Sequence, residues 1–278
     1  MLLSAFEAVI LTIISIAFGA IGNISGGGGG TFVVPVMVEL FDKPINVLLG
    51  AVFFMYFTGA LSGLVVYARK GLVDYRSGVI LALPCIPGVA IGTLLETSIS
   101  KIEFKIMLGV VTIALSVLVL LRRNQTASIN QSQTNSEVGQ PRSRAVSRIV
   151  DQSGRVFEYK PNLPAGLVIN FGAALLSGMF GAGAALVIVP AAMLFVKMPS
   201  HVAIATTRIM LVVLNASAVI THVSIGAIDW LYAVILAIGA LIGSILGARI
   251  AFMLSPALLT KVIAIFLIAL GAYLIISA

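Results

Sequence analysis

Long apolar runs occupy most of the chain, and short polar stretches separate them. Most of the runs hold enough residues to cross a bilayer core of about 30 Å as a helix. The second and seventh hold only about twelve residues, which as a helix reach about 18 Å, so we expect half-helices or strongly mismatched spans there. The ten runs lie near residues 5–22, 30–41, 46–67, 77–96, 104–121, 164–180, 184–196, 202–222, 231–251 and 257–277. The pattern predicts an all-α polytopic membrane protein.

The chain also repeats itself when it is shifted by 155 residues without a gap. Gly26 then falls on Gly181, and VILA at 79–82 falls on VILA at 234–237. Coincident Gly, Pro and Asp residues match by chance far less often than apolar residues, so we predict a duplication with five runs in each half. Further coincidences are Gly28 with Gly183, Pro35 with Pro190, Pro44 with Pro199, Ser62 with Ser217, Gly71 with Gly226, Asp74 with Asp229, Gly88 with Gly243 and Gly92 with Gly247.

Basic residues in the loops predict how the halves insert. The loop at 68–76 carries three basic residues and its repeat mate at 224–231 carries none, so the first is expected in the cytoplasm and the second outside. The polar, basic stretch 122–160 is then cytoplasmic too, and both termini are external. An odd number of runs per half requires opposite orientations, which predicts inverted repeats in a multi-pass protein of the plasma membrane. A re-entrant hairpin at the start of each half leaves this parity unchanged, so both versions stay open.

The predicted organisation has three parts. Residues 1–121 form the first transmembrane repeat, and residues 161–278 form the second. Residues 122–160 are rich in Ser, Gln, Asn and Arg, which is typical of a flexible linker, and GRVFEY at 154–159 forms at most a small strand within it.

Composition supports the membrane class and narrows the partners. Hydrophobic residues make up 60% of the chain and charged residues 10%, far from the usage of soluble domains. The net charge of +7 sits mostly in short loops, so we interpret it as a topology signal and expect the lipid bilayer, and no nucleic acid, as a partner. The single cysteine, Cys85, excludes an internal disulfide and a multi-cysteine metal site, and we expect no metal and no cofactor.

The stretch SGGGGGTFVVP at 25–35 breaks the backbone inside an apolar region. Non-helical backbone is tolerated in hydrocarbon only where it is buried or lines a polar cavity, so we expect glycine-rich broken or re-entrant helices near the midplane. The glycines precede a short helix, whose free N–H groups and positive dipole end favour an anion. The second copy, GMFGAGAALVIVP at 178–190, keeps two of these glycines but has Ala184 and Ala185. Close helix packing is the alternative use of such small residues.

Arg208 lies near mid-depth in an apolar run, where a charge is expensive and by default functional. Its fork of donors suits two oxygens of an oxyanion; a structural pair with a buried acid or with helix carbonyls is the alternative. Asp74 and Asp229 are expected to be N-caps, and His201 and His222 are interpreted as helix-end residues outside the site. The predicted substrate-binding residues are Asn23, Ser25, Gly26, Gly27, Gly28, Gly29, Gly30, Thr31, Gly181, Ala182, Gly183, Thr206, Thr207, Arg208 and Asn215.

Nearly the whole chain, except the linker, resembles a known family. Each half opens with a glycine-rich turn, a short helix and a proline, and each carries a G-x-x-D-aromatic loop, GLVDY at 71–75 and GAIDW at 226–230. Together with HVAIATT at 201–207, this set resembles the sulfite exporter TauE/SafE family, also called the toluene sulfonate uptake permease family. The resemblance implies transport of a small sulfur-containing anion such as sulfite, sulfoacetate or another organosulfonate.

We therefore predict a secondary transporter that binds a small anion at a central site between inverted repeats and moves it by alternating access. A membrane-embedded enzyme is disfavoured, because the apolar runs lack a paired-carboxylate, His-Asp or metal-ligand constellation. An anion channel is an alternative, since a glycine-lined pore also uses backbone dipoles. A non-transporting membrane subunit is the other alternative.

Overall fold

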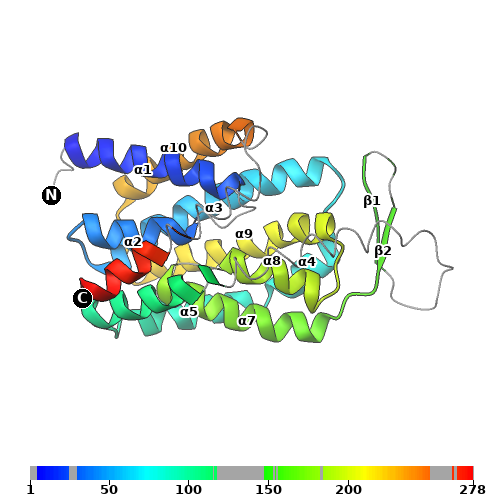
Figure 1. Ribbon diagram of the computed structural model, residues 1–278. Coiled ribbons are helices and arrows are strands. Elements are labelled where there is room, and N and C mark those ends of the chain that lie inside the picture. Colours follow the sequence, from blue (N-terminus) through cyan, green and yellow to red (C-terminus); the bar gives the residue numbers. More distant parts are fainter. Residues whose placement is uncertain are drawn as a thin grey trace.

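The protein is a bundle of helices whose axes lie mostly along one common axis, with a small two-stranded sheet at one end (Figure 1). The computed structural model describes residues 5–24, 30–114, 116–117, 147–152, 154, 156–181, 184–250, 265 and 268–277. The helices are α1 (Ala5–Ile24), α2 (Gly30–Leu40), α3 (Ile45–Arg69), α4 (Tyr75–Ala82), α5 (Cys85–Glu96), α7 (Leu163–Phe180), α8 (Ala184–Leu194), α9 (Ser200–Ser224) and α10 (Trp230–Ile250). Residues 101–114 and 268–276 are also helical.

Among the described helices, four segments are long and apolar enough to cross a membrane. They are α3, the pair formed by α4 and α5, α7 and α9. The pair α4 and α5 is interrupted only by a turn at Leu83 and Pro84, where a proline cannot donate to the helix. The prediction of an all-α multi-pass membrane protein is confirmed at this level.

Helices at equivalent places in the two halves begin and end in the same way. Pro44 and Pro199 precede α3 and α9 with nearly the same extended backbone, ψ 137° and ψ 144°. Gly71 and Gly226 lie just beyond the ends of these helices with φ of 70° and 68°, a left-handed conformation that glycine adopts without strain. Two helices that lie 155 residues apart are therefore both preceded by an extended proline and followed by a left-handed glycine.

The N-cap prediction for two aspartates is confirmed. Asp74 accepts a hydrogen bond from the Ser77 N–H at the start of α4. Asp229 accepts from the N–H groups of Leu231 and Tyr232 at the start of α10. Each carboxylate satisfies N–H groups that a helix start leaves without a partner.

Packing between the halves also repeats. Helix α1 packs on α10, and at the equivalent places α7 packs on α5. A β-carbon placed on Gly88 would lie 2.8 Å from the Phe171 carbonyl oxygen, and one placed on Gly243 would lie 2.1 Å from that of Ile16. These four positions are related by the 155-residue shift. In both places glycine lets two helix backbones approach closely.

Helices α7 and α8 form a hairpin. The Asn162 N–H, just before α7, donates to the Val196 carbonyl, just after α8, at 3.1 Å. The chain therefore returns after Gly181 to the end of the bundle from which α7 started. With eleven residues, α8 spans about 17 Å.

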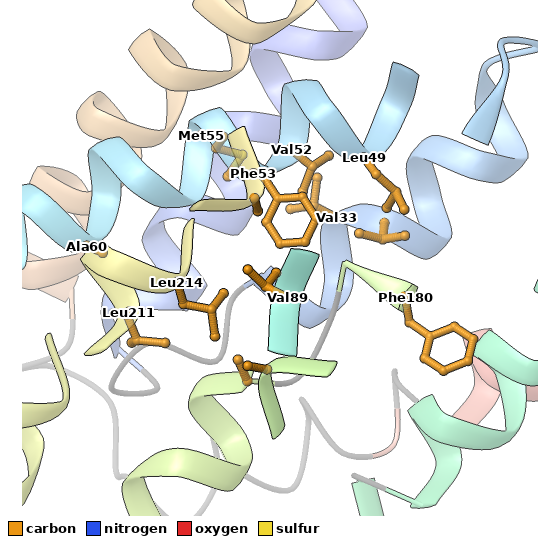
Figure 2. Close-up of a cluster of buried hydrophobic side chains, with 14 of the residues drawn as sticks. Val33, Leu49, Val52, Phe53, Met55, Ala60, Val89, Phe180, Leu211 and Leu214 are labelled. Atoms are coloured by element: carbon orange, nitrogen blue, oxygen red, sulfur yellow. The ribbon is translucent and has the colours of Figure 1, made fainter. Parts of the chain in front are cut away.

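The core is a continuous apolar cluster between the central helices. Figure 2 shows part of this cluster, including Leu49, Val52 and Phe53 of α3, Leu211 and Leu214 of α9, Val89 of α5 and Phe180 of α7. Many large apolar side chains on the outer faces of the helices are exposed, including Val168 and Ile220. An apolar exterior around an apolar core is expected of helices in lipid.

The polar stretch between the halves contains the sheet. Strand β1 (Ser147–Val150) pairs antiparallel with β2 (Val156–Tyr159), so the strand predicted within 154–159 is present. Ser147 lies opposite Tyr159, and both hydroxyls donate to Oδ2 of Asp74 at 2.5 Å. The sheet therefore docks on the turn between α3 and α4. Figure 1 places it at the end of the bundle opposite the start of α1 and residues 268–276.

Candidate functional site

The candidate site is a polar stripe on α9. Arg208, Asn215 and His222 follow one another at intervals of seven residues, which keeps them on one face of the helix. They are 6%, 5% and 0% exposed. We call these three residues the α9 polar stripe. A row of buried polar side chains in a membrane helix is expensive and points to a function.

The stripe faces α3. The Arg208 guanidinium lies over the Tyr67 ring, 5.6 Å from its centre, and the His222 ring lies 5.4 Å from that of Phe53. Since the higher-numbered residue of α9 meets the lower-numbered residue of α3, the two helices run antiparallel across the contact. This register places Asn215 opposite Ala60, midway between the two ring contacts.

Arg208 has no acidic partner among the described residues, where the ion pairs all involve other side chains. Its Nε is buried and makes no hydrogen bond. A β-carbon on Gly63 would lie 3.4 Å from the guanidinium, so the missing side chain leaves room for it beside α3. The Tyr67 ring face offsets only part of the charge. The alternative of a structural pair with a buried acid finds no support in this part of the chain.

Two of the predicted site threonines make hydrogen bonds elsewhere. Thr206 Oγ1 accepts from the Asp74 N–H at 3.0 Å, which ties α9 to the start of α4. Thr207 Oγ1 donates to the Ile204 carbonyl of its own helix at 3.1 Å. Both side chains are buried. Thr206 thus ties α9 to α4, while Thr207 bonds within its own helix, and a part of either in anion binding stays a prediction.

The glycine breaks are only partly described. Asn23 falls in α1, and Gly30 and Thr31 begin α2, so the short helix does start directly after the glycine run. Ser25, Gly26, Gly27, Gly28 and Gly29 lie outside the described residues, as do Ala182 and Gly183 in the second break. Anion binding by the free N–H groups at these glycines stays a prediction.

Gly181 has a packing role. It ends α7 in the left-handed conformation, with φ of 61°. A β-carbon there would lie 2.4 Å from Leu49 Cδ2 and 2.9 Å from Val34 Cγ2. Any larger residue would therefore push into α3 and α2, which is the close-packing use of glycine that the sequence left open.

The comparisons identify the family. The family model for the sulfite exporter TauE/SafE matches residues 11–274, which is almost the whole chain. The chain belongs to the sulfite exporter TauE/SafE family. It is 29% identical over 275 residues to the probable membrane transporter protein YunE of Bacillus subtilis (strain 168), covering 96% of this chain and 97% of that protein. No solved structure matches the chain.

Two further relatives carry similar names. The probable membrane transporter protein YdhB of Bacillus subtilis (strain 168) is 24% identical over 87% of this chain and 89% of its own length. A probable membrane transporter protein of Xylella fastidiosa (strain 9a5c) is 26% identical over 91% of this chain and 89% of its own length. Family and relatives together support a membrane transporter.

For this TauE/SafE transporter, the structure adds residues that the sequence did not single out. Tyr67 and Gly63 surround Arg208. His222, which we interpreted from the sequence as lying outside the site, is at the other end of the stripe. The seven-residue spacing of Arg208, Asn215 and His222 is visible in the sequence and could have identified the stripe. Glu96, at the end of α5, is 3% exposed and its Oε2 has no hydrogen-bond partner. No three His, Cys, Asp or Glu residues gather as metal ligands in the described ranges.

Several charged groups near the ends of the helices of the TauE/SafE chain have partners. Burial disfavours the Asp74 carboxylate, but hydrogen bonds from Ser147, Tyr159 and Ser77 outweigh this and hold its pKa below the ordinary value. Burial and the neighbouring Asp74 carboxylate raise the pKa of Tyr159, so its hydroxyl stays a donor. The loop before α3 and the start of α10 are likewise joined, since Lys43 and Asp229 form an ion pair at 2.6 Å.

Proposed function

We propose that the protein is a secondary transporter of small oxyanions, with sulfite, sulfoacetate and other organosulfonates as its substrates. The anion binds between α3 and α9, next to Arg208. The carrying observation is a buried guanidinium with a free Nε and no acidic partner in the described chain. Such a cation lacks a counter-charge that a bound anion would supply.

The chemistry of Arg208 favours an oxyanion over a halide. A guanidinium presents several N–H groups in a plane, and these match two oxygens of a sulfite or sulfonate group. The side chain keeps its charge at every physiological pH, so the site does not depend on titration of Arg208. Asn215, one register position along the stripe, adds an uncharged amide donor. The TauE/SafE family supports the same substrate class.

We further propose that the halves are inverted repeats and exchange conformations in alternating access. The matched helix ends, the α1 with α10 and α7 with α5 contacts, and the antiparallel crossing of α3 and α9 support this proposal. The last segments of the two halves also pack closely. A β-carbon on Gly109 would lie 2.7 Å from the Gly271 carbonyl oxygen, and one on Gly271 would lie 2.8 Å from that of Gly109. Inverted repeats are related by a pseudo-two-fold axis in the membrane plane. A central site on such an axis can be opened to either side by rocking one set of contacts.

In this proposal, α7 with α8 and α1 with α2 re-enter the membrane, and the glycine turns lie at their tips. The return of the chain from Asn162 to Val196 supports it for the second half. The protein lies in the plasma membrane with residues 122–160 in the cytoplasm and both termini outside. The position of the strands at the opposite end of the bundle from the start of α1 agrees with that placement (Figure 1).

The test is flux into proteoliposomes that contain the purified protein. Sulfite, sulfoacetate, taurine, sulfate and thiosulfate are offered separately, and counterflow is measured by preloading the same anion. We expect saturable uptake and counterflow of at least one sulfur oxyanion, and a loss of at least about tenfold in Arg208→Ala. Arg208→Lys should recover only part of the flux, because the fork of donors is lost.

Arg69→Ala is the matched control, because this arginine is exposed at the end of α3 and should leave flux unchanged. Uptake without counterflow would indicate the channel alternative. If no sulfur oxyanion is carried, or if Arg208→Ala behaves like Arg69→Ala, the proposed function is wrong.

A further inference from the structure

Two ring contacts between α3 and α9 occupy equivalent places in the two halves. Phe53 and Arg208 are 155 residues apart, and so are Tyr67 and His222. The contact of Tyr67 with Arg208 is therefore the repeat mate of the contact of His222 with Phe53. The Arg208 Cζ lies 5.6 Å from the centre of the Tyr67 ring, and the centres of the His222 and Phe53 rings lie 5.4 Å apart. At each end of the stripe, α9 contributes the nitrogen-bearing side chain. The contact with Phe53 thus contains the imidazole of His222, whereas the contact with Tyr67 contains the guanidinium of Arg208.

The hydrogen bonding of His222 determines its tautomer. Its Nδ1 lies 2.8 Å from the Ala218 carbonyl oxygen, which can only accept, so Nδ1 carries the hydrogen. In the neutral ring, Nε2 then presents a bare lone pair. This atom is buried without a hydrogen-bond partner, and the residue is 0% exposed. A buried acceptor left without a donor is costly, so the site is incomplete as it stands.

The helices packed on α9 contribute no fixed cation at this end. Near His222, α3 carries Tyr56 and α5 ends at Glu96, while α8 has no titratable side chain. The charged residues of α3 and α4, at 69 and 76, belong to the opposite end of the bundle. Lys43, in the loop before α3, pairs with Asp229. His222 is therefore the only group of the α9 polar stripe that can gain a charge.

We infer that His222 is a second oxyanion contact and that it takes up one proton together with the anion. This rests on the proposed function. A neutral Nε2 would repel an anion oxygen, but the protonated ring donates Nε2–H to it. The proton comes from hydronium in the external solution or from the acid form of the anion, such as hydrogen sulfite. Its transfer breaks that O–H bond and forms the Nε2–H bond, and both changes are reversed when the proton leaves with the anion.

The spacing along α9 gives the proposal a direction. His222 and Arg208 are separated by fourteen residues, or about 21 Å of helix, with Asn215 halfway. An anion therefore meets a titratable contact at one end of the stripe and a permanent cation at the other. Arg208 binds the anion at any pH, whereas the anion can occupy the His222 end of the stripe only when His222 takes up a proton. Transport then couples one proton to each anion.

The experiment compares the two histidines of the chain, His222 and His201. His201 lies against Phe157 of the cytoplasmic strand and is exposed, so it is the matched control. In proteoliposomes, sulfite uptake by the wild type should rise by about tenfold per unit fall in external pH on the alkaline side of its profile, as a one-proton requirement dictates. His222→Gln should abolish this slope, since its amide cannot titrate, and His201→Gln should retain it.

A second measurement uses the unmutated protein, so it does not depend on the folding of a variant. Histidine labelled with nitrogen-15 reports the protonation of Nε2 directly. Adding sulfite at constant pH should move the His222 Nε2 signal from the unprotonated to the protonated range and leave that of His201 unchanged. The inference is overturned if His222 stays unprotonated with the anion bound, or if His222→Gln keeps the wild-type slope.

Different outcomes of these experiments distinguish a failure of the inference about His222 from a failure of the proposed function. Loss of the pH slope in Glu96→Gln but not in His222→Gln would assign the proton to Glu96 and overturn the inference about His222. Wild-type sulfite exchange with an unchanged slope in His222→Gln leaves the proposed function intact. Absence of exchange of any sulfur oxyanion by the wild type would overturn the proposed function itself, and the inference with it.

Discussion

Replacing Tyr159 by Phe removes one hydroxyl group from the contact that docks the strands on the helical bundle. That hydroxyl donates to Asp74 Oδ2 at 2.5 Å, and both residues are buried, at 8% and 3% exposed. The ring is kept, so the packing of Tyr159 changes little. The change therefore measures one hydrogen bond to a buried carboxylate, and we expect the strands to undock more often.

The remaining partners of Asp74 set the magnitude. A hydrogen bond to a charged group contributes about 1.5 to 3 kcal/mol. After the substitution the carboxylate still accepts from the hydroxyl of Ser147 and from the N–H and hydroxyl of Ser77. It is not left as an unpaired buried charge, so the loss lies in the lower half of that range, about 1.5 to 2 kcal/mol. This corresponds to roughly 10- to 30-fold more of the undocked state.

Hydrogen exchange in lipid nanodiscs provides the assay. Peptides covering residues 147–159 should exchange roughly 10- to 30-fold faster in Tyr159→Phe than in the wild type, while peptides from α9 should not change. Tyr75→Phe is the control, because Tyr75 is 57% exposed at the start of α4. If exchange at 147–159 is unchanged, or if Tyr75→Phe accelerates it equally, Asp74 does not hold the strands.

Two further predictions concern the same contact and the helix packing. Because the folded state lowers the pKa of Asp74, its contribution to docking is present above the unfolded pKa of about 3.9 and is lost as pH falls through the lower folded pKa. A population of the undocked state that does not grow on acidification would contradict this. Gly92→Ala should lower the melting temperature, because a β-carbon there would lie 2.2 Å from a backbone oxygen of α7, and overpacking costs about 1 to 3 kcal/mol. Gly59→Ala, with nothing within 4 Å, should melt like the wild type, and equal shifts for both variants would refute the packing argument.

Sequence alone was sufficient for the features that depend on neighbours along the chain. The membrane class follows from the length of apolar runs, since lipid leaves a backbone no partner except its own helix. The N-cap roles of Asp74 and Asp229 and the strand near residue 157 follow from local rules, and all three are confirmed. The family resemblance rested on similarly local motifs, and the family model confirms it.

The sequence also singled out Arg208, because a charge within an apolar run is visible without a structure. Its surroundings were not visible. Tyr67 and Gly63 reach it only because α3 and α9 cross in an antiparallel register, which depends on how the two halves pack. The same packing gives Thr206 a contact that the sequence did not reveal, because the N–H at the start of α4 donates to its hydroxyl.

Burial at the ends of helices was the feature that only the tertiary structure decided. His222 and Glu96 both lie at helix ends, where an isolated helix would leave them wet. In the bundle, Phe53 covers His222, and the Ala227 N–H after α9 donates back to the His222 carbonyl. A residue's exposure is set by the segments that fold over it, and these come from distant parts of the chain. The sequence therefore determined the membrane class, the helix caps and the buried charge of Arg208, while the packing of the two halves decided which polar groups lie together.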